Sequence, residues 1–284
     1  MKKPSKRTVS TIVLLLVFVV GIELLAYPSV SDWWNSLHQS RAIASYAEQV
    51  ASMDDDTYEE LLAEAQAYNE SLLTKSDRFN LSDEELEEYE QLLSVDGTDV
   101  IGYLEIDKID VELPIYHGTS SAVLQTGLGH LEGSSLPIGG ESTHSVISGH
   151  RGLASAKLLT DLDQMEEGDT FVIHVLDETL TYEVDQIRIV EPTDFSELAI
   201  VEGEDYCTLM TCTPYGINTH RLLVRGHRVD NADTDTRVTA DAVQIDPMTV
   251  APLVAVPLLV LLLAGLLARN RKRSRLHTGK RGNA

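Results

Sequence analysis

Residues 205–229 read DYCTLMTCTPYGINTHRLLVRGHRV, two strand-forming runs on either side of a turn. The β-branched and apolar residues predict strands at 206–212 and 221–229, and Pro214 and Gly216 predict the turn between them. Cys212 would then end the first strand and Arg221 would begin the second. If the two strands pair across the turn, the guanidinium lies beside the thiol.

Further strands are predicted upstream of this pair. Apolar residues alternate with period two over 102–106 and 109–116, and the remaining candidates are 144–148, 170–176 and 179–190. Helix is nearly absent from this half of the chain, with 154–163 as the one helical candidate. Six to eight short strands over residues 95–230 predict a mainly β domain, either a sandwich or a closed barrel.

Residues 29–94 are predicted to be helical, because apolar residues recur there at three- and four-residue steps. Asp54 is a candidate N-cap between two helices. Residues 73–80 show no period and are expected to form a loop. Ser82 and Glu85 fit a capping box that opens a short acidic helix reaching about Leu93.

Two apolar segments, residues 8–28 and 248–268, are long enough to cross a bilayer. Basic residues crowd the outer end of each, in segments 1–7 and 269–284, so the positive-inside rule places both termini in the cytoplasm and the middle of the chain outside. Residues 231–247 are polar and suit a linker. The alternative for the first segment is a cleaved signal peptide.

The region between the two spans is strongly acidic. Residues 32–246 contain 44 Asp and Glu against 11 Lys and Arg. Such a surface repels phosphate backbones, which excludes nucleic acid as a partner. It suits a solvated external domain, and attraction of lysine-rich proteins is the alternative interpretation.

The two cysteines are expected to have different roles. On one strand, Cys207 and Cys212 would lie roughly 16 Å apart and point to opposite faces, too far for a disulfide, which needs Cα atoms within about 7 Å. Cys207 fits a small buried side chain. Cys212, at a sheet rim, is a candidate nucleophile, and a thiolate there requires a nearby positive charge.

A basic partner for Cys212 has several candidates, because seven histidines lie between 117 and 227. His150 is the best single choice: it follows the predicted strand 144–148, between Gly149 and Arg151. The sequence alone leaves the other histidines open. Arg221 could hold a substrate carbonyl or an oxyanion, or it could be a surface arginine.

The segment Thr208-Leu209-Met210-Thr211-Cys212 resembles the TLxTC strand of sortases, membrane-anchored cysteine transpeptidases of Gram-positive bacteria, and residues 213–226 resemble the pilin-polymerising class C in particular. His150, within SGHRG, and Arg221 match the family's histidine and arginine. The resemblance covers about residues 95–229. It implies a closed eight-stranded β-barrel, with N-terminal helices and one transmembrane helix at each end.

The resemblance also implies a reaction. Cys212 would attack the Thr–Gly bond of an LPxTG-like sorting signal on a secreted pilin or surface protein and form a thioester. His150 would act as general acid, and Arg221 would orient the substrate and stabilise the oxyanion. A pilin lysine would then resolve the thioester. This chemistry implies no metal or other cofactor, and clusters such as 54–56 lack EF-hand spacing.

Class C sortases also carry a lid, usually marked by Asp-Pro-aromatic. Asp77 and Phe79 match it, while Arg78 replaces the proline. The resemblance implies that Asp77 meets a cation such as Arg221 and that Phe79 covers the thiol. Losing proline removes a fixed φ, which predicts a more mobile lid. The alternative is a plain helix–helix linker.

Three alternative functions follow from the same residues. One is a sortase that anchors single proteins to peptidoglycan. Another is a non-enzymatic acidic ectodomain, in which Cys212 would be incidental. An L,D-transpeptidase also uses Cys and His outside the membrane, but that family does not present its thiol on a strand pair of this kind.

Overall fold

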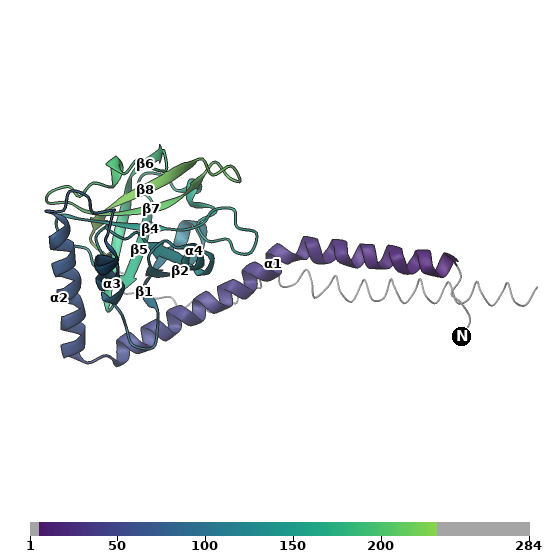
Figure 1. Ribbon diagram of the computed structural model, residues 1–284, viewed down its shortest axis with the longest axis horizontal. Helices are drawn as coiled ribbons and strands as arrows, with labels where there is room; N and C mark the ends of the chain where they lie inside the picture. The colour runs from purple at the N-terminus through teal and green to yellow at the C-terminus, as the bar shows by residue number, and fades with distance from the viewer. Residues whose placement is uncertain (1–5, 232–284) are drawn as a thin grey trace, which may run out of the picture. The chain divides into compact units, whose positions relative to one another are not determined.

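The two strands predicted around Pro214 are present as β7 (Asp205–Thr213) and β8 (His220–Val229), which pair antiparallel. They belong to a closed barrel of eight strands in the order β1-β2-β3-β4-β7-β8-β6-β5 (Figure 1). The computed structural model describes residues 6–231. Of the two architectures left open by strand patterning, the barrel is therefore the correct one.

The remaining strands follow the predicted runs closely, with one addition. Val100–Ile106 forms β1, and the others are β2 (Val111–His117), β3 (Leu128–His130), β4 (Thr143–Ser148), β5 (Thr170–Val175) and β6 (Glu178–Val190). Alternate side chains fill the interior, which buries Leu104, Ile115, Leu209 and Val224 completely. Period-two burial is what fixes the register of each strand.

The prediction of a helix over 154–163 is wrong. That segment is a series of turns, followed by a 3₁₀ turn at Leu162–Gln164. Leu158 has φ 41°, a left-handed conformation that an α-helix cannot contain. The short helix α4 (Ser121–Thr126) and strand β3 were not predicted, and 3₁₀ turns also occur at Asp107–Ile109 and Ser196–Leu198.

The N-terminal helices begin and end near the predicted positions. Helix α1 spans Lys6–Ser52, α2 spans Asp55–Leu72 and α3 spans Asp83–Gln91. The Asp54 carboxylate accepts the amide of Thr57 at 2.9 Å, and both hydrogen bonds of the Ser82–Glu85 capping box are present. Helix α1 continues through Pro28, so the predicted apolar segment and the helix predicted to follow it are one element.

Helix α1 carries the first predicted span. It is long and apolar enough, by length and composition, to cross a membrane, although a signal sequence would meet the same criterion. The second predicted span, 248–268, lies outside the described residues, as do its flanking linker and basic tail. The chain divides into two units, one of residues 30–234 and one of residues 1–29 with 235–284.

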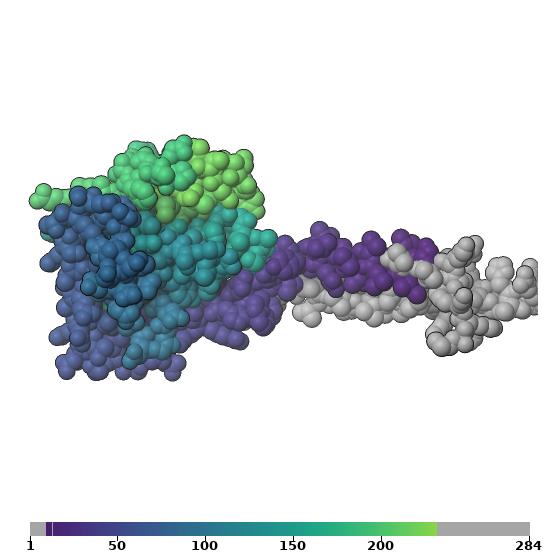
Figure 2. Space-filling view, in the orientation of Figure 1, coloured from purple at the N-terminus to yellow at the C-terminus, as the bar shows by residue number. Residues whose placement is uncertain are grey.

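Within the unit of residues 30–234, helices cover part of the barrel. The hydroxyl of Tyr46 on α1 donates to the carbonyl of Ile101 at 3.1 Å and accepts the amide of Leu176 at 2.7 Å. Asn69 on α2 bonds both backbone groups of Leu136. Figure 2 shows the blue helical residues packed directly against the teal and green residues of the barrel. These helices therefore share one hydrophobic core with the strands.

Candidate active site

The two residues that carry the proposed thiol and guanidinium lie side by side on neighbouring strands. Cys212 is the direct cross-strand partner of Arg221 in the β7–β8 ladder. Directly opposed residues of an antiparallel pair point to the same face, with Cβ atoms about 4.5–5.5 Å apart. The two strands therefore pair across the turn in the register that the sequence predicted.

Strand β4 brings the imidazole to the same rim. It runs parallel to β7, with Ser148 opposite Met210. The pairing continues past the end of β4, because the amide of Gly149 donates to the carbonyl of Met210 at 3.0 Å and the Thr211 hydroxyl donates to the carbonyl of Gly149 at 2.8 Å. The backbone of His150 therefore lies alongside that of Cys212. All three candidate residues meet at one rim of the barrel.

Gly149 is required for this close approach. A Cβ built at this position would lie 2.6 Å from Leu128 Cδ2 and 2.8 Å from Leu159 Cδ1. Real Cβ atoms do not approach other carbons so closely, so a side chain here would force either the buried Leu128 and Leu159 side chains or the backbone of residue 149 to move. Steric crowding thus explains why glycine occupies position 149, directly before the histidine.

The two cysteines face opposite sides of β7, as predicted, and both are free. Cys207 points into the barrel, is 1% exposed, and burial raises the pKa of its thiol. Cys212 is partly exposed. Of the two cysteines, Cys212 is therefore the accessible one, and it pairs with the positively charged Arg221.

The structure separates His150 from two of the other candidate histidines. Burial lowers the pKa of His130 to about 3 and that of His144 to about 4. Both rings are hydrogen-bonded inside the protein, His130 to Tyr89 and His144 to Thr208. Within residues 6–231, by contrast, the His150 ring makes no hydrogen bond or ion pair.

The loop of residues 73–80 is anchored to the barrel through Arg78. Arg78, at the position of the family's proline, is 9% exposed and donates to the carbonyls of Gly133, at 3.3 Å, and Leu198. Gly133 allows the loop to lie this close, since a Cβ there would be 1.8 Å from the Arg78 carbonyl oxygen. The guanidinium of Arg78 therefore ties the loop to two backbone carbonyls at the position where the family has proline.

Phe79 packs on the outer side of β4, β7 and β8. It stacks on Phe195 of the β6–β7 loop, with ring centroids 4.8 Å apart, and joins an apolar cluster that includes Val146, Met210 and Leu223. Met210 lies two residues before Cys212, and Leu223 two residues after Arg221, so each shares a strand face with its neighbour. Phe79 thus covers the strand face on which the thiol and the guanidinium lie.

Asp77 does not make the contact implied by the resemblance. It is exposed, and its carboxylate accepts from the side chain of Asn80 at 3.3 Å. The ion pairs among residues 6–231 do not join it to Arg221. Of the two residues that match the lid motif, Phe79 packs on Phe195 and the neighbouring apolar cluster, and Asp77 faces solvent.

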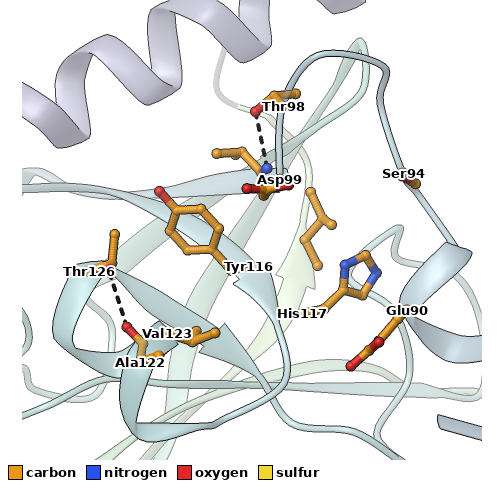
Figure 3. A pocket seen from close by; sticks show the side chains of 11 residues that line it. Glu90, Ser94, Thr98, Asp99, Tyr116, His117, Ala122, Val123 and Thr126 are labelled. Atoms are coloured by element: carbon orange, nitrogen blue, oxygen red, sulfur yellow. Dashed lines mark hydrogen bonds between the residues drawn. The ribbon is translucent and has the colours of Figure 1, made fainter. Parts of the chain in front are cut away.

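A separate cavity of about 420 Å³ lies between the end of α3, the start of β1, the end of β2 and α4 (Figure 3). Glu90, Asp99, Tyr116 and His117 are among its lining residues, and none of the candidate catalytic residues is. No group of three or more His, Cys, Asp or Glu within residues 6–231 is placed to hold a metal ion. The three candidate residues at the β4–β7–β8 rim are therefore separate from this cavity.

Comparison with known proteins agrees with this geometry. A sortase domain model matches residues 104–229. The crystal structure of sortase C1 from Streptococcus agalactiae is 53% identical with a TM-score of 0.65, and the match covers 67% of this chain and 99% of that one. The chain belongs to the sortase family. Sortases are cysteine transpeptidases, so this protein is an enzyme of that kind.

Other relatives place this sortase among the class C enzymes. Sortase C from Streptococcus pneumoniae is 51% identical with a TM-score of 0.61, over 67% of this sortase and 97% of that chain. Sortase D of Bacillus subtilis is 33% identical over 45% of this chain, a match that spans 63% of its own length. Identity is thus higher to the solved class C sortases than to sortase D.

Proposed function

We propose that this sortase cleaves an LPxTG-like sorting signal between Thr and Gly and transfers the acyl group to a lysine amine of a pilin. The observation that carries the proposal is the meeting of Cys212, His150 and Arg221 at one rim of the barrel. Two of the similar solved proteins are described as pilus-related or in terms of pilin substrate specificity. The lid-like packing of Phe79 also favours this class.

Each residue has a role that its position supports. The Cys212 thiolate attacks the threonine carbonyl, so an S–C bond forms and the carbonyl becomes an oxyanion next to Arg221. The C–N bond to glycine then breaks, and the His150 imidazolium gives its proton to the departing amine. The product is a thioester on Cys212. A neutral lysine amine attacks it, His150 takes the amine's proton, and the thiolate leaves.

The proposed location follows from the two apolar segments. Residues 8–28 and 248–268 would anchor the chain, both termini would lie in the cytoplasm, and the barrel would lie outside, where secreted substrates pass. The acceptor amine would then be presented by another secreted protein.

Trapping of the thioester tests the reaction. The full chain in detergent micelles is incubated with a peptide containing Leu-Pro-Glu-Thr-Gly and analysed by mass spectrometry. We expect an acyl adduct on Cys212 in the wild type and in Cys207→Ala, and none in Cys212→Ala. Absence of an adduct in the wild type, with this peptide and with the sorting signal of a candidate pilin, would reject the proposal.

Anchoring to peptidoglycan is the alternative outcome, and the acceptor distinguishes it. The trapped thioester is offered a pilin domain and a cross-bridge peptide in equal amounts. Formation of an isopeptide bond to the pilin supports polymerisation. Exclusive transfer to the cross-bridge peptide would assign this sortase to cell-wall anchoring instead.

A further inference from the structure

Arg151, the residue after His150, is held in a way that the proposed chemistry does not yet explain. Its Nη1 donates to the Thr213 hydroxyl at 3.3 Å, and its Nη2 pairs with the carboxylate of Asp163. Its guanidinium lies 6.0 Å from the ring centroid of Tyr215. The side chain is only 9% exposed, although arginine is almost never buried without a partner.

These contacts join the segments that carry the thiol and the imidazole. Thr213 is the residue after Cys212, just as Arg151 is the residue after His150. On the other side, the hydroxyl of Thr211 donates to the carbonyl of Gly149 at 2.8 Å. A hydrogen bond therefore joins the two segments both one residue before and one residue after the pair. Neither bond uses a group that takes part in the proposed reaction.

We propose that Arg151 is a positioning residue, which through Thr213 keeps the His150 imidazole within reach of the Cys212 sulfur. The loop after β4 has no regular secondary structure, and such loops are more mobile than strands. A side-chain hydrogen bond to the β7 end removes that freedom on one side, and Asp163 keeps the guanidinium oriented. The inference rests on the proposed roles of Cys212 and His150.

The chemistry makes this positioning matter. His150 must give a proton to the leaving amine, which requires a heavy-atom distance of about 2.6–3.2 Å in the reacting complex. A displacement of about 1 Å costs on the order of a hundredfold in rate. Because Arg151 does not contact the substrate in this scheme, its loss lowers kcat and leaves KM nearly unchanged.

The test compares four variants of the full chain in detergent micelles, with cleavage of the Leu-Pro-Glu-Thr-Gly peptide as the readout. We expect Arg151→Gln and Thr213→Val each to lower kcat by about tenfold to a hundredfold, with KM within about twofold. The double variant should be no worse than the poorer single variant, because both remove the same hydrogen bond. Arg151→Lys keeps the charge and one donor and should recover part of the rate.

The pH profile separates positioning from simple stability. In Arg151→Gln the limb of the rate profile that reports His150 should shift or flatten. A variant that is merely less stable should instead lose rate by the same factor at every pH, provided that the assay temperature lies below its thermal midpoint. Arg41→Gln, an exposed arginine on α1, is the matched control and should behave as wild type. Additive losses in the double variant, or a rise in KM alone, overturn the inference.

Failure of the Arg151 inference can be distinguished from failure of the proposed function. If wild type forms no thioester on Cys212, the proposed function fails first. If wild type forms the thioester and Arg151→Gln matches Arg41→Gln in kcat and pH profile, the proposed function stands and Arg151 has no positioning role.

Discussion

At the scale of single residues, Arg78 shows how a substitution can replace one kind of restraint with another. Proline stiffens a loop through its fixed φ, whereas Arg78 holds the loop through hydrogen bonds to the carbonyls of Gly133 and Leu198. Its burial lowers the pKa of the guanidinium, but arginine stays charged at any pH in which the protein is folded. The loop is thereby tied to both the β3–β4 and β6–β7 connections.

We predict that Arg78→Ala lowers the free energy of unfolding by about 2–4 kcal/mol, because two buried carbonyls lose their donor. The measurement is urea unfolding of the full chain in detergent micelles, followed by near-UV circular dichroism. Arg41→Ala, at an exposed position, should change stability by no more than about 0.5 kcal/mol. Equal midpoints for the two variants would contradict the anchoring role.

His144 gives the protein an acid-sensitive core. Burial lowers its pKa to about 4, below the ordinary value of 6.5, so the unfolded chain binds a proton that the folded chain does not between those two pH values. Stability is therefore complete above about pH 6.5 and falls as the pH drops toward 4, by up to about 1.4 kcal/mol per pH unit for one histidine.

We predict that His144→Gln loses part of this pH dependence, since glutamine has no proton to bind. Unfolding free energies of wild type and variant at pH 7 and pH 5 provide the check. His130, with a pKa lowered to about 3, contributes a slope of its own, so the variant retains a reduced slope. An unchanged slope in the variant would show that His144 does not titrate as described.

At the scale of elements, two loops are tied to other parts of the fold by specific side-chain contacts. The loop 73–80 packs through Phe79 on Phe195, and the loop after His150 is held by α1, where the Asp32 carboxylate accepts the amide of Lys157 at 2.6 Å and the Asn35 side chain donates to the carbonyl of Ser155 at 2.8 Å. Loops this well tied have little freedom to rearrange unless the tie is broken.

We propose that the loop 73–80 is a lid over Cys212. Replacing its two motif side chains should therefore make the thiol more accessible. Phe79→Ala combined with Asp77→Ala should speed alkylation of Cys212 by iodoacetamide about three- to tenfold, because the aromatic stack is worth about 0.5–1.5 kcal/mol. Leu73→Ala, an exposed position in the same loop, serves as control. Alkylation no faster than in wild type would reject the lid.

The contact of α1 with the His150 loop gives a second prediction at this scale. Asp32→Ala frees the amide of Lys157, so deuterium uptake by a peptide covering residues 153–160 should rise. The control is Ser36→Ala, whose hydroxyl bonds only the Trp33 carbonyl on the same helix. Equal uptake in the two variants would mean that the bond does not restrain the loop.

The elements that sequence could not predict are those whose shape depends on distant partners. β3 has three residues, Leu128–His130, too few to show a period, and it exists because β2 and β4 lie on either side of it. Residues 154–161 contain apolar residues at helical spacing, but backbone bonds such as Leu159 to His150 impose turns. Strands with clear alternation, and helices with caps, were predicted correctly because those signals are local.

At the scale of the whole molecule, the acidic charge is the dominant property, with a formal net charge of −23. The clustering of basic residues at the two ends makes the middle of the chain more acidic still. A field of this sign raises the rate at which basic partners arrive and slows acidic ones.

We predict that transfer from the Cys212 thioester to a basic, lysine-rich pilin domain slows about tenfold when ionic strength rises from 0.1 M to 1 M, which shortens the Debye length from about 10 Å to about 3 Å. Hydrolysis of the same thioester by water should change little and serves as the internal control. A transfer rate that is independent of salt would show that the acidic field does not guide the acceptor.

The site itself could be predicted only in part. Cys212 and Arg221 are close in sequence, so the turn between their strands was enough to pair them. His150 lies far from both along the chain, and only the parallel pairing of β4 with β7 brings it there. The buried arginines at 78 and 151 could not be foreseen, because arginine is ordinarily a surface residue and the groups that hold these two side chains, at Gly133, Leu198 and Asp163, are distant in sequence.

The Cys212 side chain points outward because of the number of residues that separate it from Cys207. Cys207 faces the interior of the barrel, and so does every second residue after it along β7. Adding or removing one residue within that strand would exchange the two faces and turn the reactive sulfur into the barrel. Length variation among natural homologues should therefore be absent between positions 207 and 212, while the turn at 214–219 can lengthen or shorten, with the Arg221 register as its only constraint.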